Sequence, residues 1–215
     1  MARNSRAAVL RQRTDLERPG VGNAERWQQI LAAAAEEFYE KGYRAARLQD
    51  IGERVGLLTG SLYHYIRSKD ELLFALVSTA VQLELATAVE NEDAARAGAK
   101  RRLQQFVRRQ LALLDEHRAL VRAVQRDLPF LGDEDRARMD SMKASLRDFV
   151  RGIIEEGIRS GEFRADADVD VAINSLFALV NSTPEWARSP GRRSMAEIGD
   201  WYTRVVVCGL QLSTT

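Results

Sequence analysis

The seven residues from Thr59 to Tyr65 are suited to hydrogen bonding with a charged polymer rather than to catalysis. They read Thr-Gly-Ser-Leu-Tyr-His-Tyr. Hydroxyl and imidazole groups hydrogen-bond to phosphate oxygens and base edges, and Gly60 removes bulk so that the backbone can approach a partner. Under the alternative interpretation, Tyr63 and Tyr65 are ordinary half-buried aromatics and His64 packs or faces solvent.

The elements around this segment have the spacing of a helix-turn-helix. Apolar periodicity predicts short helices over residues 48–55 and 59–65, with Gly56 as the left-handed turn between them. Gly52 is the small residue that lets the two helices approach. The apolar residues expected to fix their angle are Ile51, Val55, Leu57 and Leu62. Because the second helix of such a pair enters the major groove by its N-terminal end, the segment from Thr59 is expected to face DNA.

Helices are also predicted on both sides of this pair. One begins at Asn23 as N-cap and closes at Gly42. Another begins at Ser68, which forms a capping box with Glu71, and runs to about residue 90. Lys69 adds a positive charge to the positive end of that helix, which predicts a phosphate contact.

The rest of the chain keeps helical periodicity, without the alternation of strands. Apolar stripes predict helices over residues 103–114, 118–127, 139–153, 171–180 and 198–210, with breaks near Gly161 and at Pro184. The predicted fold class is therefore all-α, with about nine helices. A three-helix N-terminal domain would precede a larger helical domain.

The amino-acid composition narrows the classes of protein to which this chain can belong. The hydrophobic share is 45% and the charged share 29%, which allows a buried core, and the single cysteine, Cys208, excludes an internal disulfide. No apolar run reaches the length of a membrane span, so we expect a cytoplasmic protein. Residues 1–70 contain 12 basic and 9 acidic residues, a net +3, whereas the remainder carries −2. The mildly basic N-terminal segment, residues 1–70, suits a DNA-binding domain.

Residues 1–22 contain five arginines, few apolar residues and the Pro19-Gly20 breaker. We expect a flexible basic arm. Two alternatives stay open: a solvated tail with no role, or an arm that contacts phosphates or the minor groove.

The sequence resembles the tetracycline-repressor (TetR) family over residues 26–73. The matching segments are 38–43, 50–57 and 60–73, and the string Ser68-Lys69-Asp70-Glu71-Leu72 is the most specific part. The resemblance implies DNA contacts from the recognition helix and Lys69, with Leu62 in the core. The full set of predicted DNA-binding residues is Arg47, Leu58, Thr59, Gly60, Ser61, Tyr63, His64, Tyr65 and Lys69. Arg44 and Arg54 are expected to be solvated.

Two positions depart from the family pattern. Ala46-Arg47 stands where a Thr pair usually caps the second helix and touches phosphate. Arg47 offers a charged phosphate contact instead, but no side-chain oxygen remains for capping. Gly52 replaces the usual alanine at the helix crossing.

The resemblance implies a dimeric transcriptional regulator, in most cases a repressor that a small effector releases from a palindromic operator. Residues 23–68 would form the DNA-binding domain and residues 69–215 the effector and dimerisation domain. An activator and a helical adaptor that no longer binds DNA are alternatives. We expect no enzyme, cofactor or metal site, because the chain has no nucleophile elbow, phosphate loop or zinc-ligand spacing.

Effector and dimer residues are predicted from fold analogy and from apolar stripes. The linker at residues 184–191, with Trp186, is similar to a subgroup that responds to fatty-acyl or steroid-derived acyl-CoA thioesters; a hydrophobic drug-like effector is the alternative. Residues expected to line the pocket are Phe106, Gln110, Leu113, His117, Val121, Gln125, Phe149, Ile153, Phe177, Asn181 and Trp186. Residues expected at the dimer interface are Phe177, Val180, Trp201, Tyr202, Val205, Cys208 and Leu212. Packing in the protomer core is the alternative for each.

Overall fold

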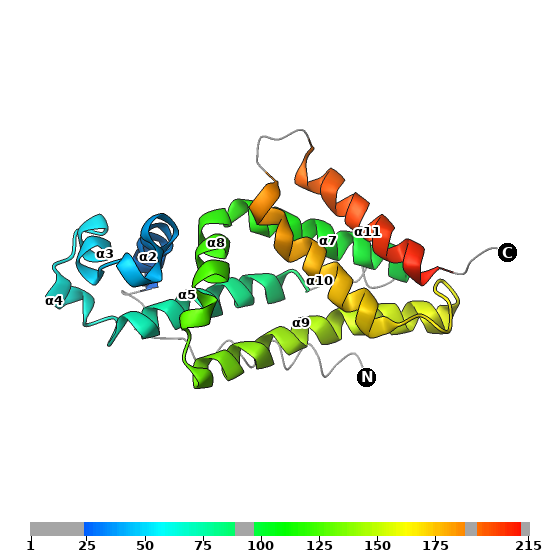
Figure 1. Ribbon diagram of the computed structural model, residues 1–215, viewed down its shortest axis with the longest axis horizontal. Coiled ribbons are helices and arrows are strands. Elements are labelled where there is room, and N and C mark those ends of the chain that lie inside the picture. Colours follow the sequence, from blue (N-terminus) through cyan, green and yellow to red (C-terminus); the bar gives the residue numbers. More distant parts are fainter. Residues whose placement is uncertain (1–23, 89–96, 188–192, 212–215) are drawn as a thin grey trace. The chain divides into compact units, whose positions relative to one another are not determined.

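The computed structural model describes residues 24–88, 97–187 and 193–211, and every regular element among them is helical (Figure 1). The nine α-helices of these described ranges are α2 (Ala24–Ala45), α3 (Leu48–Arg54), α4 (Thr59–Leu62), α5 (Lys69–Ala86), α7 (Ala99–Glu116), α8 (Arg118–Asp127), α9 (Asp133–Ser160), α10 (Val169–Trp186) and α11 (Met195–Leu210), with a 3-10 turn, η2, over Leu128–Phe130. The predicted all-α class and the helix number are confirmed. The predicted arm over residues 1–22 and the Asn23 cap lie outside the described residues.

The chain divides into two compact units. Unit 1 contains residues up to 82 together with 117–142, and unit 2 contains residues 83–116 together with 143 onward. Helices α5 and α9 each contribute residues to both units. The domain boundary at residue 68 stays a prediction.

Unit 1 is organised around α2. Its apolar positions Ile30, Leu31, Ala34 and Phe38 are buried, which is the stripe that the sequence periodicity predicts. Helix α3 packs on α2, α4 packs on α3, and α8 packs along α2 (Figure 1). The backbone leaves the helical region at Gly42, where φ is 83°, so the regular part of α2 ends where the sequence predicts.

The start of α5 agrees with the prediction at Ser68 but differs at Glu71. The Ser68 hydroxyl accepts a hydrogen bond from the Glu71 N–H at 3.1 Å. The Glu71 carboxylate turns back to the N–H of Arg67, at 2.7 Å, rather than to that of Ser68. The predicted Ser68 hydroxyl cap is therefore present, but the Glu71 carboxylate accepts the N–H of the residue before Ser68 and not that of Ser68 itself.

In unit 2, α11 packs against α7 and α10, and α10 also packs against α7. Asp200 of α11 accepts two hydrogen bonds from Arg108 of α7, both at 2.6 Å, and one from Gln104 at 2.9 Å. These bonds hold the Asp200 pKa down at about 2, with Arg108 as the largest cause. The α7–α11 contact is thus polar at its edge and apolar inside.

Pro184 does not break its helix, contrary to the sequence prediction. Helix α10 runs on to Trp186, and the N–H of Ala187 still reaches the carbonyl of Thr183 at 2.9 Å. Because proline has no N–H, the helix continues here without the hydrogen bond that position 184 would otherwise donate to the carbonyl of Val180.

Within the described ranges no helix combines the length and apolarity needed to cross a bilayer, and no group of three His, Cys, Asp or Glu side chains could hold a metal ion.

Candidate nucleic-acid interface

The turn between α3 and α4 is fixed by two glycines. The N–H of Leu57 donates to the Gly52 carbonyl at 2.8 Å, and a Cβ on Gly52 would lie 2.8 Å from the carbonyl oxygen of Leu57. An alanine there would force the turn to shift. Gly56 has a φ of 67°, in the left-handed region that the sequence predicts for it. Gly52 is therefore required by a close backbone approach, and this outweighs its poor helix propensity.

Helix α4 is shorter than predicted. It covers Thr59–Leu62, and residues 63–65 continue as turns held by hydrogen bonds from His64 N–H to Ser61 (3.2 Å) and from Tyr65 N–H to Leu62 (2.9 Å). Its N-cap is Leu58, whose side chain accepts no bond from the first turn. A Ser, Thr, Asp or Asn at that position typically contributes about 1 kcal/mol. The first turn of α4 therefore lacks the stabilisation that a polar N-cap side chain would give.

The leading edge of α4 faces outward. Leu58 is 82% exposed and Tyr63 54% exposed, and Gly60 and His64 are also exposed. Thr59, Ser61 and Tyr65 are half-buried. Leu62 is fully buried, which confirms it as core. The seven-residue segment therefore presents a mixed polar and apolar edge and holds one leucine inward.

Arg47 and Arg44 lie near the start of α3. Arg47 is exposed and is the N-cap of α3, and no side-chain bond caps that helix, as the missing Thr pair predicts. Arg44 is exposed with its guanidinium over the Phe130 ring, 4.8 Å from the centroid. A phosphate contact from Arg47 stays a prediction.

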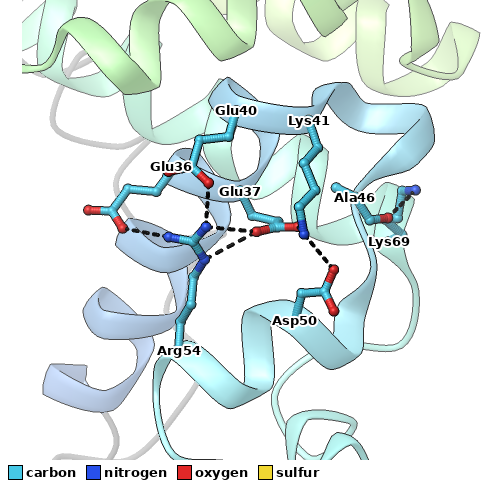
Figure 2. A network of polar contacts seen from close by, with 8 residues as sticks. All are labelled: Glu36, Glu37, Glu40, Lys41, Ala46, Asp50, Arg54 and Lys69. Atoms are coloured by element: carbon cyan, nitrogen blue, oxygen red, sulfur yellow. Dashed lines mark hydrogen bonds and ion pairs between the residues drawn. The ribbon is translucent and has the colours of Figure 1, made fainter.

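Lys69 holds the end of α2. Its ammonium donates to the carbonyls of Ala46 (2.8 Å; Figure 2) and Arg44 (3.2 Å) and lies 4.6 Å from the Tyr43 ring centroid. Burial lowers the Lys69 pKa below its usual value. An ammonium has three N–H donors, so these two carbonyls leave one for another acceptor. The predicted phosphate contact is compatible with this geometry and stays a prediction.

An ion-pair network that the sequence did not predict joins α2 to α3 (Figure 2). At its centre is Glu37, whose carboxylate is fully buried. The Lys41 ammonium lies 2.6 Å from Glu37 and 2.7 Å from Asp50 of α3. These hydrogen bonds raise the pKa of Lys41 and lower that of Asp50, chiefly through each other. Lys41 thus bridges the two helices across a buried negative charge.

Arg54 completes the network from the other end of α3. Its guanidinium lies 3.0 Å from Glu37, 2.5 Å from Glu40 and 3.3 Å from Glu36 (Figure 2). Arg54 is exposed, as the sequence predicts, but the sequence did not predict that three carboxylates of α2 pair with it. The charges set the position of α3 on α2, and so the position of α4.

A second polar contact ties the end of α2 to α8. The buried Asp127 carboxylate accepts the N–H of Tyr43 at 3.0 Å. Arg126 pairs with Asp127 at 2.9 Å and donates to the carbonyls of Tyr39, at 3.1 Å, and Phe38. Residues 117–142 are therefore fastened to the helix that leads into the helix-turn-helix.

Family models match both parts of the chain. The model described as "Bacterial regulatory proteins, tetR family" covers residues 30–76, and that described as "Tetracyclin repressor-like, C-terminal domain" covers residues 96–210, more than half of the chain. The chain belongs to the TetR family. It is a DNA-binding transcriptional regulator, and α3–α4 of this TetR-family chain is the helix-turn-helix.

Relatives match nearly the whole length of this TetR-family chain. The transcriptional repressor KstR2 of Rhodococcus jostii is 26% identical over 88% of this chain and 93% of its own. The structure of the ketosteroid transcriptional regulator KstR2 of Mycobacterium tuberculosis has a TM-score of 0.74 at 26% identity, over 87% of this chain and 96% of that one. FadR of Bacillus subtilis, solved with stearoyl-CoA, has a TM-score of 0.71 at 24% identity, over 86% of this chain and all of that one, and shows the shared fold.

The predicted effector residues divide between the two units. Gln125 (exposed), His117 (half-buried) and Val121 (buried) belong to unit 1. The remaining eight belong to unit 2: Phe106, Gln110 and Ile153 are buried, Leu113, Phe149 and Phe177 half-buried, Asn181 and Trp186 exposed. The sequence analysis predicted that all eleven residues line one pocket, and this common role stays a prediction.

Inside unit 2, aromatic and polar side chains meet along α7. The Phe106 ring centroid lies 5.7 Å from that of Phe149 and 6.2 Å from that of Phe177. Gln110, one turn further, donates to the Glu84 carbonyl at 3.1 Å and the Thr87 hydroxyl at 2.5 Å. Burial raises the pKa of the Glu84 carboxyl above its usual value. An apolar wall thus lies next to buried polar groups.

The predicted dimer residues separate into exposed and internal ones. Trp201, Val205 and Cys208 are exposed at helical spacing on one face of α11. Val180 and Tyr202 are buried within unit 2, and the Tyr202 hydroxyl lies 2.9 Å from that of Thr183. For these two the interface prediction is corrected, because the protomer core already covers them. Phe177 is half-buried against Phe106, and Leu212 lies outside the described residues.

Proposed function

We propose that this TetR-family chain is a dimeric repressor that leaves a palindromic operator when an acyl-CoA binds its C-terminal part. The observation that carries the proposal is the outward edge of α4, with Leu58, Tyr63 and His64 exposed and Leu62 buried. A recognition helix needs this arrangement, since its N-terminal residues meet base edges in the major groove.

The DNA contacts would follow from the order of residues along this edge. Thr59, Gly60 and Ser61 come first and face the bases, while Tyr63 and Tyr65 reach phosphates or thymine methyls. His64 lies beside them. The positive charges of Arg47 and Lys69 flank the edge and suit phosphate contacts. Such contacts position the helix, and the base contacts give the sequence preference.

The exposed face of α11 supports the dimer. Trp201, 48% exposed, and Val205, 53% exposed, are large apolar side chains that a monomer would leave in water. Two copies related by a two-fold axis would cover the same face on each partner. The axis would place one recognition helix on each half of a palindrome.

The relatives support the effector class. FadR is solved with stearoyl-CoA, and KstR2 is described as a ketosteroid regulator. In this chain the rings of Phe106, Phe149 and Phe177 offer an apolar wall for an acyl group. One turn along α7 from Phe106, the Gln110 amide bonded to the Glu84 carbonyl offers polar groups for the polar end of the ligand. The proposal includes fatty-acyl and steroid-derived acyl chains; a hydrophobic drug-like effector is the alternative outcome.

We further propose that the chain acts by binding alone, in the cytoplasm, without an enzymatic reaction. Its DNA affinity would change through a shift between two conformations, because the effector binds one of them more tightly.

The test is operator release measured by fluorescence anisotropy. Stearoyl-CoA and a steroid-derived acyl-CoA are titrated into the protein–operator complex, with free CoA and stearate as controls. Release by an acyl-CoA but not by the controls, with a raised melting temperature, supports the proposal. Tighter DNA binding in the presence of an acyl-CoA would contradict effector-driven release. No effect of any acyl-CoA would remove this effector class while leaving the DNA-binding assignment in place.

A further inference from the structure

We propose that Leu58 recognises the 5-methyl group of a thymine in each half of the operator. The inference rests on the proposed operator binding and goes beyond it by assigning one side chain to one chemical group of one base.

Leu58 is exposed to an unusual degree. At 82% it is the most exposed large apolar side chain among the described residues; the next are Val171 at 59% and Trp186 at 56%. It lies directly ahead of Thr59, at the end of α4 that enters the groove. Of the exposed apolar side chains in unit 1, it is the one at the very start of the recognition helix.

The backbone holds Leu58 in one place. Its carbonyl accepts the N–H groups of Ser61, at 2.9 Å, and Leu62, at 3.1 Å. The preceding residue, Leu57, is bonded to Gly52 at 2.8 Å. With bonds on both sides, the residue is presented in a fixed orientation and loses little backbone freedom on binding DNA.

The chemistry of this side chain favours an apolar contact. Leucine has no donor or acceptor, so it makes no hydrogen bond to phosphate or to a base edge. In the major groove the apolar group is the C5 methyl of thymine, which takes apolar contacts. Thr59 and Ser61 supply hydroxyls beside it, and Gly60 has open space where a Cβ would be. Because thymine carries a C5 methyl group and cytosine does not, an apolar contact from Leu58 beside these hydroxyls would favour thymine.

A structural role does not account for Leu58. Its side chain covers almost no surface of its own protomer and caps no helix. A serine at this N-cap would stabilise α4 better. The stability of the fold therefore favours a different residue at position 58. We infer that the leucine serves a contact with another molecule.

The experiment uses the operator selected from random duplex DNA. Each thymine of a half-site is replaced singly by deoxyuridine, which keeps base pairing and removes only the methyl group. We expect one position per half-site at which the wild-type dimer binds about fourfold more weakly, the effect of one buried methyl, and about 15-fold more weakly when both half-sites are changed. Leu58→Ser should bind equally the operators that carry thymine and uracil at that position, and it should keep any preference that Tyr63 or Tyr65 gives at other thymines.

Two controls separate DNA recognition from folding. Leu58→Ser should unfold at the same or higher urea concentration than wild type, because it restores a cap. Val171→Ser, an exposed apolar truncation in unit 2, should keep the thymine preference. Equal wild-type affinity for every thymine and uracil operator overturns the proposal while operator binding stands. A Leu58→Ser protein that still prefers thymine at the position found for the wild type also overturns it. If no specific complex forms with any DNA, the proposed function and this inference fall together.

Discussion

The carboxylate of Asp127 accepts a hydrogen bond from the backbone N–H of Tyr43 at 3.0 Å, across 84 positions of sequence. Tyr43 follows the regular part of α2 and leads into the helix-turn-helix, while Asp127 ends α8. The bond therefore fixes the entry to the DNA-binding elements from outside them. Residues 117–142 belong to the same compact unit as the recognition helix, and this bond is one of the contacts within it.

Replacing Asp127 with alanine should destabilise unit 1. The change leaves the Tyr43 N–H unpaired and removes the partner of Arg126, and a buried hydrogen bond to a charged group contributes about 1.5–3 kcal/mol. Urea unfolding should show a loss of about 2 kcal/mol. Asp140→Ala, an exposed change on α9, is the control and should cost under about 0.5 kcal/mol. Equal losses in the two variants would contradict the role given to Asp127.

Glu37 and Glu36 form a matched pair on α2, since both lie near Arg54 but only Glu37 is buried. Glu37→Ala should cost about 2–4 kcal/mol, because Lys41 and Arg54 lose the charge at the centre of the network. Glu36→Ala should cost under about 1 kcal/mol, as for other surface ion pairs. Thermal and urea unfolding of both variants measures the difference. A Glu36 effect as large as that of Glu37 would mean that burial does not decide the strength of these pairs.

Asp200 should make unit 2 sensitive to acid. Its pKa is about 2 in the folded chain, against about 3.9 for an unfolded aspartate. A lowered folded pKa stabilises the fold above the unfolded pKa, and this contribution is lost as pH falls from about 4 to about 2. The wild type should therefore exceed Asp200→Asn in urea stability at pH 7, and the gap should shrink below pH 4. A gap that is constant between pH 7 and pH 3 would argue against the Arg108–Asp200 contact as its cause.

Lys69→Ala separates a phosphate contact from a purely structural ammonium. If Lys69 contacts phosphate, affinity should fall alike for operator and random DNA, and the slope of log affinity against log salt should decrease by about 1 per half-site. If Lys69 only holds the Ala46 and Arg44 carbonyls, unfolding midpoints should change and the slope should stay as in wild type. Titrations at several salt concentrations distinguish the two.

Local signals predicted much of the fold because short-range chemistry decides it. The apolar stripe of α2, the Ser68 cap and the left-handed Gly56 each depend on residues within a few positions. The need for a small residue at Gly52 was also visible in the helix-turn-helix spacing, but the contact with the Leu57 carbonyl was seen only in the structure.

Contacts between distant residues were missed for the opposite reason. The i,i+4 spacing of Glu37 and Lys41 suggests a pair, but nothing local shows that Glu37 is buried or that Arg54 reaches it. The length of α4 was overestimated because the helical pattern runs on past Leu62, whereas residues 63–65 fold as turns bonded to Ser61 and Leu62. Val180 and Tyr202 look like interface residues in sequence, and only packing shows that the protomer covers them.

The central claim is that two copies of α4 read one face of a DNA duplex, and selection from a random duplex library tests it most directly. We expect enrichment of a palindrome whose half-sites lie about 10–10.5 base pairs apart, or a multiple of that spacing. Tyr63→Ala, which changes a 54% exposed residue, should fold normally and enrich the same sequence more weakly. Failure to enrich any sequence, or enrichment of sites without two-fold symmetry, would contradict the account.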